Sequence, residues 1–379
     1  MRTIIVLSLL FASISAQSVK ALFSYKIVPT NYLILHTDLR LNGNELCKPI
    51  IKDDVLYQGL HSGLILSQDI ENKRILWRFM GVGSPTSAVL YKNILIVSTL
   101  KGLVYALNGS SGKLIWSYNT QKQILSRIRV YDYTAYVQTT LDTLYAFDIR
   151  DGSLIWQYAS KDIVGGLVVH ATPTPYISND VIFTGFSNGS TVALDAKTGK
   201  LLWERKPNLI KQFQDIVASP AINKDVVIFG SYENGLSCLN KQDGTIVWER
   251  SDLKRPLGLS ITGNAVYVTR ATGDLYRLDL RTGDTIWKTN LGEKVRLFTP
   301  YQLYSLIVVG VDNGKNKGIV VLDPDDGTIK QRFSIVSGLS AGPVLSGNRI
   351  YAVSNGGFLY CYELSPANRQ KRDFFKGLL

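Results

Sequence analysis

Residues 192–203 read Val-Ala-Leu-Asp-Ala-Lys-Thr-Gly-Lys-Leu-Leu-Trp, and this stretch decides the fold because the chain repeats it. Most copies keep an Asp or Asn in the middle and a Gly four residues before the end. All six tryptophans close a copy, and one later copy has lost its Trp; these closing positions are Trp77, Trp116, Trp156, Trp203, Trp248, Trp287 and Gln331. Successive closing positions lie 39 to 47 residues apart. This period is typical of the blades of a β-propeller.

Each copy predicts a β-hairpin. In the second copy, an apolar strand at 94–97 precedes an alternating strand at 103–107, and a tight turn at 108–112 leads into an outer strand at 113–116. The Asp or Asn can bond to the turn backbone, and the Gly supplies the positive φ of the turn. A preceding segment such as 218–225 supplies a fourth, inner strand. Four antiparallel strands per repeat make one propeller blade.

Counting the copies predicts eight blades. Seven come from the repeats above, and residues 350–362 form an eighth that stops before its outer strand. The apolar segment 22–35 can donate the missing strand and close the ring, which removes the exposed sheet edges of an open array. We therefore expect an all-β protein, with residues 19–364 as a single eight-bladed propeller and 365–379 as a basic tail.

The composition agrees with a folded, exported protein. The chain has 379 residues, 45% hydrophobic and 19% charged, which is too apolar for a disordered chain. Residues 1–18 combine Arg2, an apolar run and small residues, as in a secretory signal peptide. The net charge of +12 suggests an anionic partner or surface. Because export is expected, nucleic acid is not the expected partner.

Catalytic and metal-binding patterns are weak. The three histidines, His36, His61 and His170, do not have the spacing of metal ligands. Two of the three cysteines, Cys238 and Cys361, occupy the small-residue slot of the repeat and are expected to be buried thiols far from each other; Cys47 is expected to be a separate thiol on the inner strand of blade one. We predict no catalytic residue, no metal and no cofactor.

The stretch 193–203 resembles the Trp-docking motif of the quinoprotein (PQQ) propellers, and the resemblance extends over about residues 22–364. Within that superfamily the chain is most similar to the BamB family of outer-membrane assembly proteins. The resemblance implies a non-enzymatic periplasmic scaffold at the inner face of the outer membrane. It implies docking on the POTRA region of the BamA barrel subunit during assembly and insertion of outer-membrane β-barrel proteins, with unfolded barrel proteins as further partners.

The resemblance also implies partner-binding positions. The family has a Leu-x-Leu-Arg stretch before the inner strand of one blade and Asp-x-Asp in the next. The matching residues here are Leu167, Val169 and His170 in the first stretch and Asp215 in the second. His170 stands where the family has Arg, and Val217 stands where it has the second Asp, so the partner surface is expected to differ as well.

Two other features bear on function. BamB proteins usually carry a lipid-modified cysteine directly after the signal; none lies near Ala16, so we expect this chain to lack that anchor. Basic residues gather at Lys206 and Lys211, at Arg127 and Arg129, at Lys294 and Arg296, and in the tail. Such a tail can touch anionic lipid or an acidic protein face, although a solvated tail is the simpler interpretation.

Two alternatives remain open at this point. One is a periplasmic PQQ-dependent dehydrogenase or other cofactor-binding propeller. Those enzymes hold PQQ with a calcium ion, an Asp base and a disulfide between adjacent cysteines, and this chain has no Cys-Cys pair. The other is a propeller that recognises polysaccharide, which only the 20 tyrosines suggest.

Overall fold

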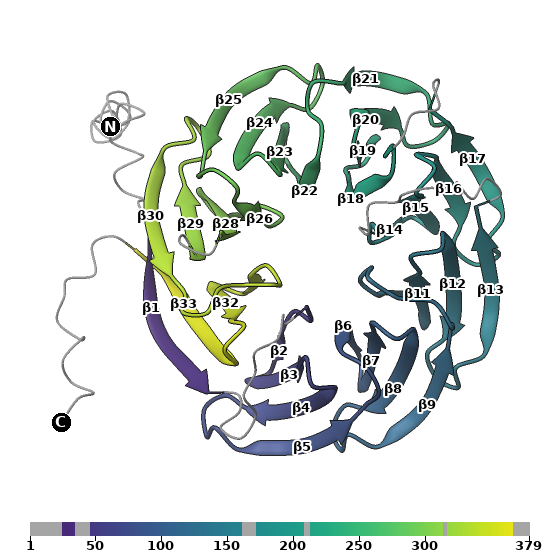
Figure 1. The fold of residues 1–379 in the computed structure, drawn as a ribbon, viewed down its shortest axis with the longest axis vertical. Coiled ribbons are helices and arrows are strands. Elements are labelled where there is room, and N and C mark those ends of the chain that lie inside the picture. The colour runs from purple at the N-terminus through teal and green to yellow at the C-terminus, as the bar shows by residue number, and fades with distance from the viewer. Residues whose placement is uncertain (1–24, 35–45, 161–171, 208–212, 314–316, 367–379) are drawn as a thin grey trace, which may run out of the picture.

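The computed structural model describes residues 25–34, 46–160, 172–207, 213–313 and 317–366. Their strands form eight antiparallel sheets arranged around a central axis, as Figure 1 shows. The predicted all-β, eight-bladed propeller is therefore confirmed. Within the ranges described, no helix is long and apolar enough to cross a membrane. The expected signal peptide at 1–18 and nearly all of the basic tail lie outside these ranges.

Each blade runs from an inner strand beside the axis to an outer strand at the edge of the ring. In blades one to four the strands are β2 (Ile50–Lys52), β3 (Val55–Gly59), β4 (Leu64–Asp69) and β5 (Ile75–Met80); β6 (Pro85–Tyr91), β7 (Ile94–Thr99), β8 (Leu103–Asn108) and β9 (Leu114–Asn119); β10 (Arg129–Tyr131), β11 (Thr134–Gln138), β12 (Thr143–Asp148) and β13 (Leu154–Ala159); β14 (Tyr176–Ser178), β15 (Val181–Gly185), β16 (Thr191–Asp195) and β17 (Leu201–Arg205). In blades five to eight they are β18 (Ile216–Ile222), β19 (Val226–Ser231), β20 (Gly235–Asn240) and β21 (Ile246–Arg250); β22 (Pro256–Thr262), β23 (Ala265–Arg270), β24 (Asp274–Asp279) and β25 (Thr285–Asn290); β26 (Arg296–Leu297), β27 (Tyr301–Leu303), β28 (Leu306–Asp312), β29 (Lys317–Leu322) and β30 (Ile329–Ser334); β31 (Val344–Ser346), β32 (Arg349–Val353), β33 (Phe358–Pro366) and β1 (Tyr25–Ile34).

The N-terminal strand closes the ring, as predicted. β1 pairs with β33 in antiparallel register from Tyr25 opposite Pro366 to Ile34 opposite Phe358. Figure 1 shows this first strand as the outer edge of the last blade. Blade eight is thus built from both ends of the propeller sequence, and β33 would otherwise present an open edge.

The core lies between neighbouring blades. In blade two, for example, the middle strand β8 is largely buried, whereas most side chains of the outer strand β9 are at least partly exposed. One cluster, for example, packs Tyr57 and Trp77 of blade one against Leu95, Val97 and Tyr105 of blade two. Each blade therefore depends on its neighbours to bury its apolar faces.

The tryptophans join each blade to the next. Every indole Nε1 donates a hydrogen bond to a backbone carbonyl in the hairpin turn of the following blade, at 2.7 to 3.1 Å; the acceptors, in order from Trp77 to Trp287, are Gly109, Ile149, Ala196, Lys241, Leu280 and Pro324. The repeat thus encodes both a hairpin and its contact with the preceding blade.

The seam between blades seven and eight lacks this contact, because Gln331 has replaced the Trp. There the rings of Phe333 and Tyr362 pack with their centroids 4.8 Å apart. Both side chains belong to a cluster that spans the two blades. Similar aromatic pairs, such as Phe79 with Tyr105, lie beside the Trp at other seams, so this seam keeps the aromatic pair but lacks the indole.

The cysteine predictions are confirmed only in part. Cys238 and Cys47 are buried and no disulfide forms, but Cys361 is half-buried rather than buried. The residue paired with Cys238 on the outer strand is Trp248, whereas Cys361 is paired with Asn31 of β1. The small slot in blade eight therefore has no indole opposite it. Cys47 precedes the inner strand of blade one, which begins at Ile50.

Candidate functional site

The loops of blades three to five meet on one face of the ring in a connected hydrogen-bond network. Both Asp142 carboxylate oxygens accept from the backbone N–H of Ser187, at 3.0 and 3.1 Å. The amide of Asn188 donates to Ser160 Oγ at 3.0 Å. The amide of Gln214 in turn donates to the Asn188 carbonyl at 2.7 Å. We call these five residues, Asp142, Ser160, Ser187, Asn188 and Gln214, the loop frame.

The loop frame is largely buried. All its members except Ser187 are at most 6% exposed. Burial raises the pKa of Asp142, and the hydrogen bonds from Ser187 oppose that rise. A buried carboxylate that accepts several hydrogen bonds holds the neighbouring turns in fixed positions. The loops of this face therefore start from well-ordered anchor points.

Three of the predicted partner-binding residues, Leu167, Val169 and His170, lie outside the described residues. The described residues on either side of them make hydrogen bonds. Before them, Ser160 belongs to the loop frame; after them, Thr174 bonds both to the backbone N–H of Arg127 at 3.1 Å and to Ser219 Oγ at 2.9 Å. Ser160 follows the outer strand of blade three, and Thr174 precedes the inner strand of blade four and lines a cavity on the propeller axis.

The fourth predicted residue, Asp215, is described and is only 3% exposed. It lies between Gln214 and the inner strand β18, and its carbonyl accepts from Tyr232 N–H at 2.9 Å. The adjacent Ile216 N–H bonds to Phe186 O of blade four at 3.1 Å. Asp215 therefore sits at the joint between blades four and five, where its burial suits a residue that shapes the loops.

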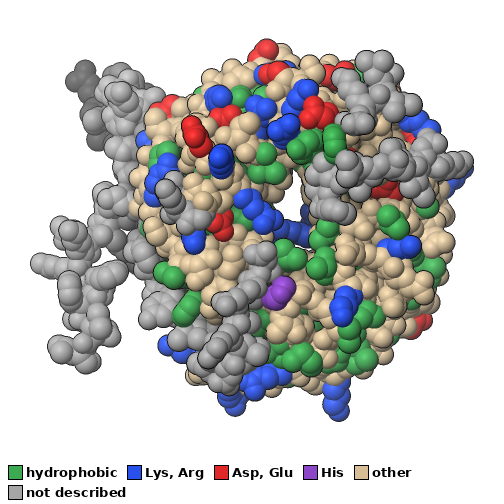
Figure 2. Space-filling model, viewed as in Figure 1, with side chains coloured by type: hydrophobic (Ala, Val, Ile, Leu, Met, Phe, Trp, Pro, Cys, Tyr) green, Lys and Arg blue, Asp and Glu red, His purple; other side chains and the backbone are tan. Residues whose placement is uncertain are grey.

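A second feature is a cavity of about 580 Å³ on the propeller axis. Its walls come from the inner strands and adjoining loops, and Figure 2 shows Lys and Arg side chains gathered at the central opening. Five cations line it: Lys48, Arg127, Arg129, Arg255 and Arg296. Within the part of the chain that the structure describes, no Asp, Glu or His lines this cavity.

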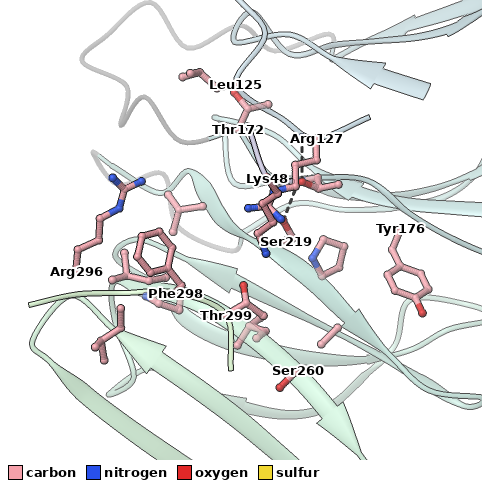
Figure 3. A pocket seen from close by; sticks show the side chains of 18 of the residues that line it. Lys48, Leu125, Arg127, Thr172, Tyr176, Ser219, Ser260, Arg296, Phe298 and Thr299 are labelled. Atoms are coloured by element: carbon pink, nitrogen blue, oxygen red, sulfur yellow. Dashed lines mark hydrogen bonds between the residues drawn. The ribbon is translucent and has the colours of Figure 1, made fainter. Parts of the chain in front are cut away.

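Neutral oxygen atoms accept hydrogen bonds from Lys48 and Arg129. Lys48 Nζ donates to the Tyr301 hydroxyl at 2.8 Å, and its charge lies 5.0 Å from the centroid of that ring. Arg129 Nε donates to the Pro175 carbonyl at 3.2 Å. Figure 3 shows Lys48 beside Arg127, while Arg296 lies apart from them next to Phe298.

The positive charges act on one another. Burial, followed by the charges of Arg127 and Arg129, holds the pKa of Lys48 well below its ordinary value. Burial also lowers the pKa of Arg127 and of Arg296, and Asp312 opposes the effect on Arg296. The cavity is consequently an electropositive environment in which a charged lysine is disfavoured.

Sequence reasoning identified only part of this cavity. Arg127, Arg129 and Arg296 stood out as basic residues at inner strands, but Lys48 and Tyr301 did not. Tyr301 reaches the axis because the inner strand of blade seven is split into β26 and β27, which both pair with β28. Pro300 interrupts the ladder between these two pieces, since proline cannot donate to it. Pro300 was therefore the feature of the sequence that could have indicated the split inner strand.

These features define a closed propeller of Trp-docked repeats with an organised loop face and a basic axial cavity. A sequence profile described as outer membrane protein assembly factor BamB matches residues 61–289. The chain belongs to the BamB family.

Individual relatives agree with this assignment. The outer membrane protein assembly factor BamB of Burkholderia pseudomallei is 26% identical over 322 residues, which cover 82% of each chain. The crystal structure of BamB from Moraxella catarrhalis superimposes with a TM-score of 0.76 at 21% identity, covering 89% of this chain and all of that one. The quinohemoprotein alcohol dehydrogenase from Comamonas testosteroni has a TM-score of 0.70 at 12% identity, covering 89% of this chain and 76% of that one, so it shares the fold.

The cavity does not fit the calcium-bound PQQ of the quinoprotein enzymes. A calcium ion requires several oxygen ligands, usually including carboxylates. Among the described residues, the cavity wall contains no carboxylate, and no group of three His, Cys, Asp or Glu side chains is placed to hold a metal. The wall is cationic where the calcium ion would need carboxylates, and we derive no chemistry through a calcium-bound cofactor.

Proposed function

We propose that this protein is a non-enzymatic periplasmic scaffold for the assembly and insertion of outer-membrane β-barrel proteins. Its site of action would be the inner face of the outer membrane, where it would dock on the POTRA region of a BamA-like barrel subunit. The observation that carries the proposal is membership of the BamB family, with a match over residues 61–289. The rigid ring supports it, because a preformed surface loses little conformational entropy when a partner binds.

The loop face over blades three to five is the proposed docking surface. Leu167 and Val169 would supply apolar anchors, with His170 beside them, since a few well-placed residues provide most of the binding energy of an interface. The buried Asp215 would act by positioning the joint between blades four and five. The loop frame supports this assignment because it includes Ser160, the last described residue before the segment that carries Leu167 and Val169, and connects blades three, four and five.

The proposal is tested by measuring binding of the purified protein to the purified POTRA region of the barrel subunit from the same organism. The test variant is Leu167→Asp/Val169→Asp. The control is Leu114→Asp/Ile115→Asp, which places the same two charges at exposed aliphatic positions on the outer strand of blade two.

Binding by the unmodified protein and the control, with at least about tenfold weaker binding by the test variant, is the expected result for loss of two anchor side chains. Equal binding by all three proteins would retain the scaffold function and remove the proposed docking loop. If the unmodified protein did not bind the POTRA region, the docking proposal would be overturned.

A further inference from the structure

The axial cavity has the size of a ligand site. Its volume of about 580 Å³ lies in the range of roughly 300 to 1,000 Å³ common to small-molecule sites. Its wall mixes cations with hydroxyl groups, such as those of Thr172 and Thr299, and with apolar side chains such as Leu297. This composition is suited to a polar molecule of limited size.

Arg296 is affected by the nearby charge of Asp312, and the other four cations of the cavity divide into two kinds. Arg255 forms an ion pair with Glu233, at 3.6 Å. Lys48, Arg127 and Arg129 bond instead to neutral groups, including the Tyr301 hydroxyl and the Pro175 carbonyl. We call these three residues the cationic cluster. Within the described residues, no salt bridge neutralises a member of the cluster.

The cationic cluster costs stability in the protein alone. Like charges close to one another in a partly dehydrated cavity repel, and the lowered pKa of Lys48 reflects that repulsion together with burial. Buried charges are normally paired with opposite charge. The hydrogen bonds to neutral acceptors orient the N–H donors of the cluster, but they do not neutralise its positive charge. An anion in the cavity would remove this cost.

We propose that the axial cavity binds a small molecule with two or more anionic oxygen groups, either phosphates or carboxylates. The cationic cluster binds one such group and Arg296 binds the other. Figure 3 shows that Arg296 lies apart from the cluster, so a single small ion does not satisfy both. Arginine binds both phosphate and carboxylate through paired N–H donors, and lysine adds a compact charge. This ligand site is separate from the proposed docking function and does not rest on it.

Titration calorimetry at low ionic strength, with pyrophosphate and with citrate as probes, tests the proposal. The test variant is Arg127→Gln/Arg129→Gln. The control, Arg78→Gln/Arg281→Gln, removes the same charge from exposed positions outside the cavity. We expect one site per chain, retained in the control and weakened at least about tenfold in the test variant, because charge-assisted hydrogen bonds are lost.

The two probes distinguish the sources of the anionic groups. Tighter binding of pyrophosphate assigns a phosphate ligand, and tighter binding of citrate assigns a carboxylate ligand. Lys48→Met, which keeps both arginines, is the second variant should the double variant not fold; it too should bind more weakly than the control. The proposal is overturned if neither probe binds the unmodified protein, or if the cavity variants bind as tightly as the control.

Discussion

The indole ring of Trp116 lies against Gly152 in the turn of the next blade. A Cβ atom at position 152 would stand 2.6 Å from Trp116 Cδ2, and this glycine has φ of 78°. The same turn supplies the carbonyl of Ile149, which accepts the indole N–H at 2.8 Å. Gly152 thus serves two purposes: it allows the turn of its own blade, and it leaves room for the Trp of the preceding blade.

Gly152→Ala should therefore be more destabilising than an ordinary turn substitution. It introduces strain from the positive φ and overlap with the indole, together about 2 to 4 kcal/mol. The control is Gly263→Ala, where φ is also positive, at 58°, but no atom lies within 4 Å of the added Cβ. Urea unfolding of both variants measures the difference. Equal destabilisation would show that the indole moves aside without cost.

Removal of the first strand should open the ring. A chain that begins at residue 35 lacks β1 and leaves the β33 edge without the partner seen in the structure. Open edges pair with other chains, so we expect self-association and a lower urea midpoint than for a chain that begins at residue 19. Size-exclusion chromatography and urea unfolding check this. A monomer of unchanged stability would contradict the closure by β1.

The charge on Lys48 should oppose folding in the absence of an anion. Lys48→Met is expected to raise the free energy of unfolding at neutral pH by on the order of 1 kcal/mol. Since the pKa of Lys48 is lowered in the folded state, the penalty is complete below that folded pKa and disappears as pH rises towards the unfolded value of about 10.4. The gain should shrink over that interval.

Urea unfolding at several pH values measures this effect, with the exposed Lys113→Met as the control. Added salt should also reduce the gain, because mobile ions screen the repulsion. A destabilised Lys48→Met at every pH would mean that the hydrogen bond to Tyr301 outweighs the repulsion.

Buried phenols should make the propeller sensitive to alkali. Burial raises the pKa of Tyr136 to about 12, and its hydroxyl donates to the Ala196 carbonyl at 2.9 Å. An unfolded tyrosine ionises near 10, so the folded state holds the extra proton between about pH 10 and 12 and stability falls there by about 1.4 kcal/mol per pH unit for this group. Burial also raises the pKa of the Cys238 thiol to about 12, which adds to the fall.

Tyr136→Phe should flatten this dependence while costing some stability at neutral pH through the lost hydrogen bond. Tyr304→Phe, at a position that is 61% exposed, serves as the control. Stability measured across the alkaline range gives both slopes. An unchanged slope for Tyr136→Phe would exclude this hydroxyl as a source of the pH dependence.

The local repeat was sufficient to predict the blades and their number. The first six copies each contain their own turn, their own strands and the Trp that meets the following blade, so these contacts are encoded within about one period of sequence. Even the missing eighth outer strand was predictable, because the apolar segment at 22–35 had no other partner. The reduced burial of Cys361 was missed, since the strand opposite it is β1, from the other end of the chain, and not the Trp-bearing strand of a repeat.

The functional surfaces required the tertiary structure. The resemblance to the BamB family pointed to Leu167, Val169, His170 and Asp215, but only the structure shows that Asp215 is buried at the joint of two blades. The cationic cluster brings Lys48 of blade one next to Arg127 of blade three and Tyr301 of blade seven. The repeating hairpins follow from the sequence alone, because their contacts are local. Which distant inner strands share the axis depends on closure of the ring, and this closure therefore sets where the positive charge of the cationic cluster lies.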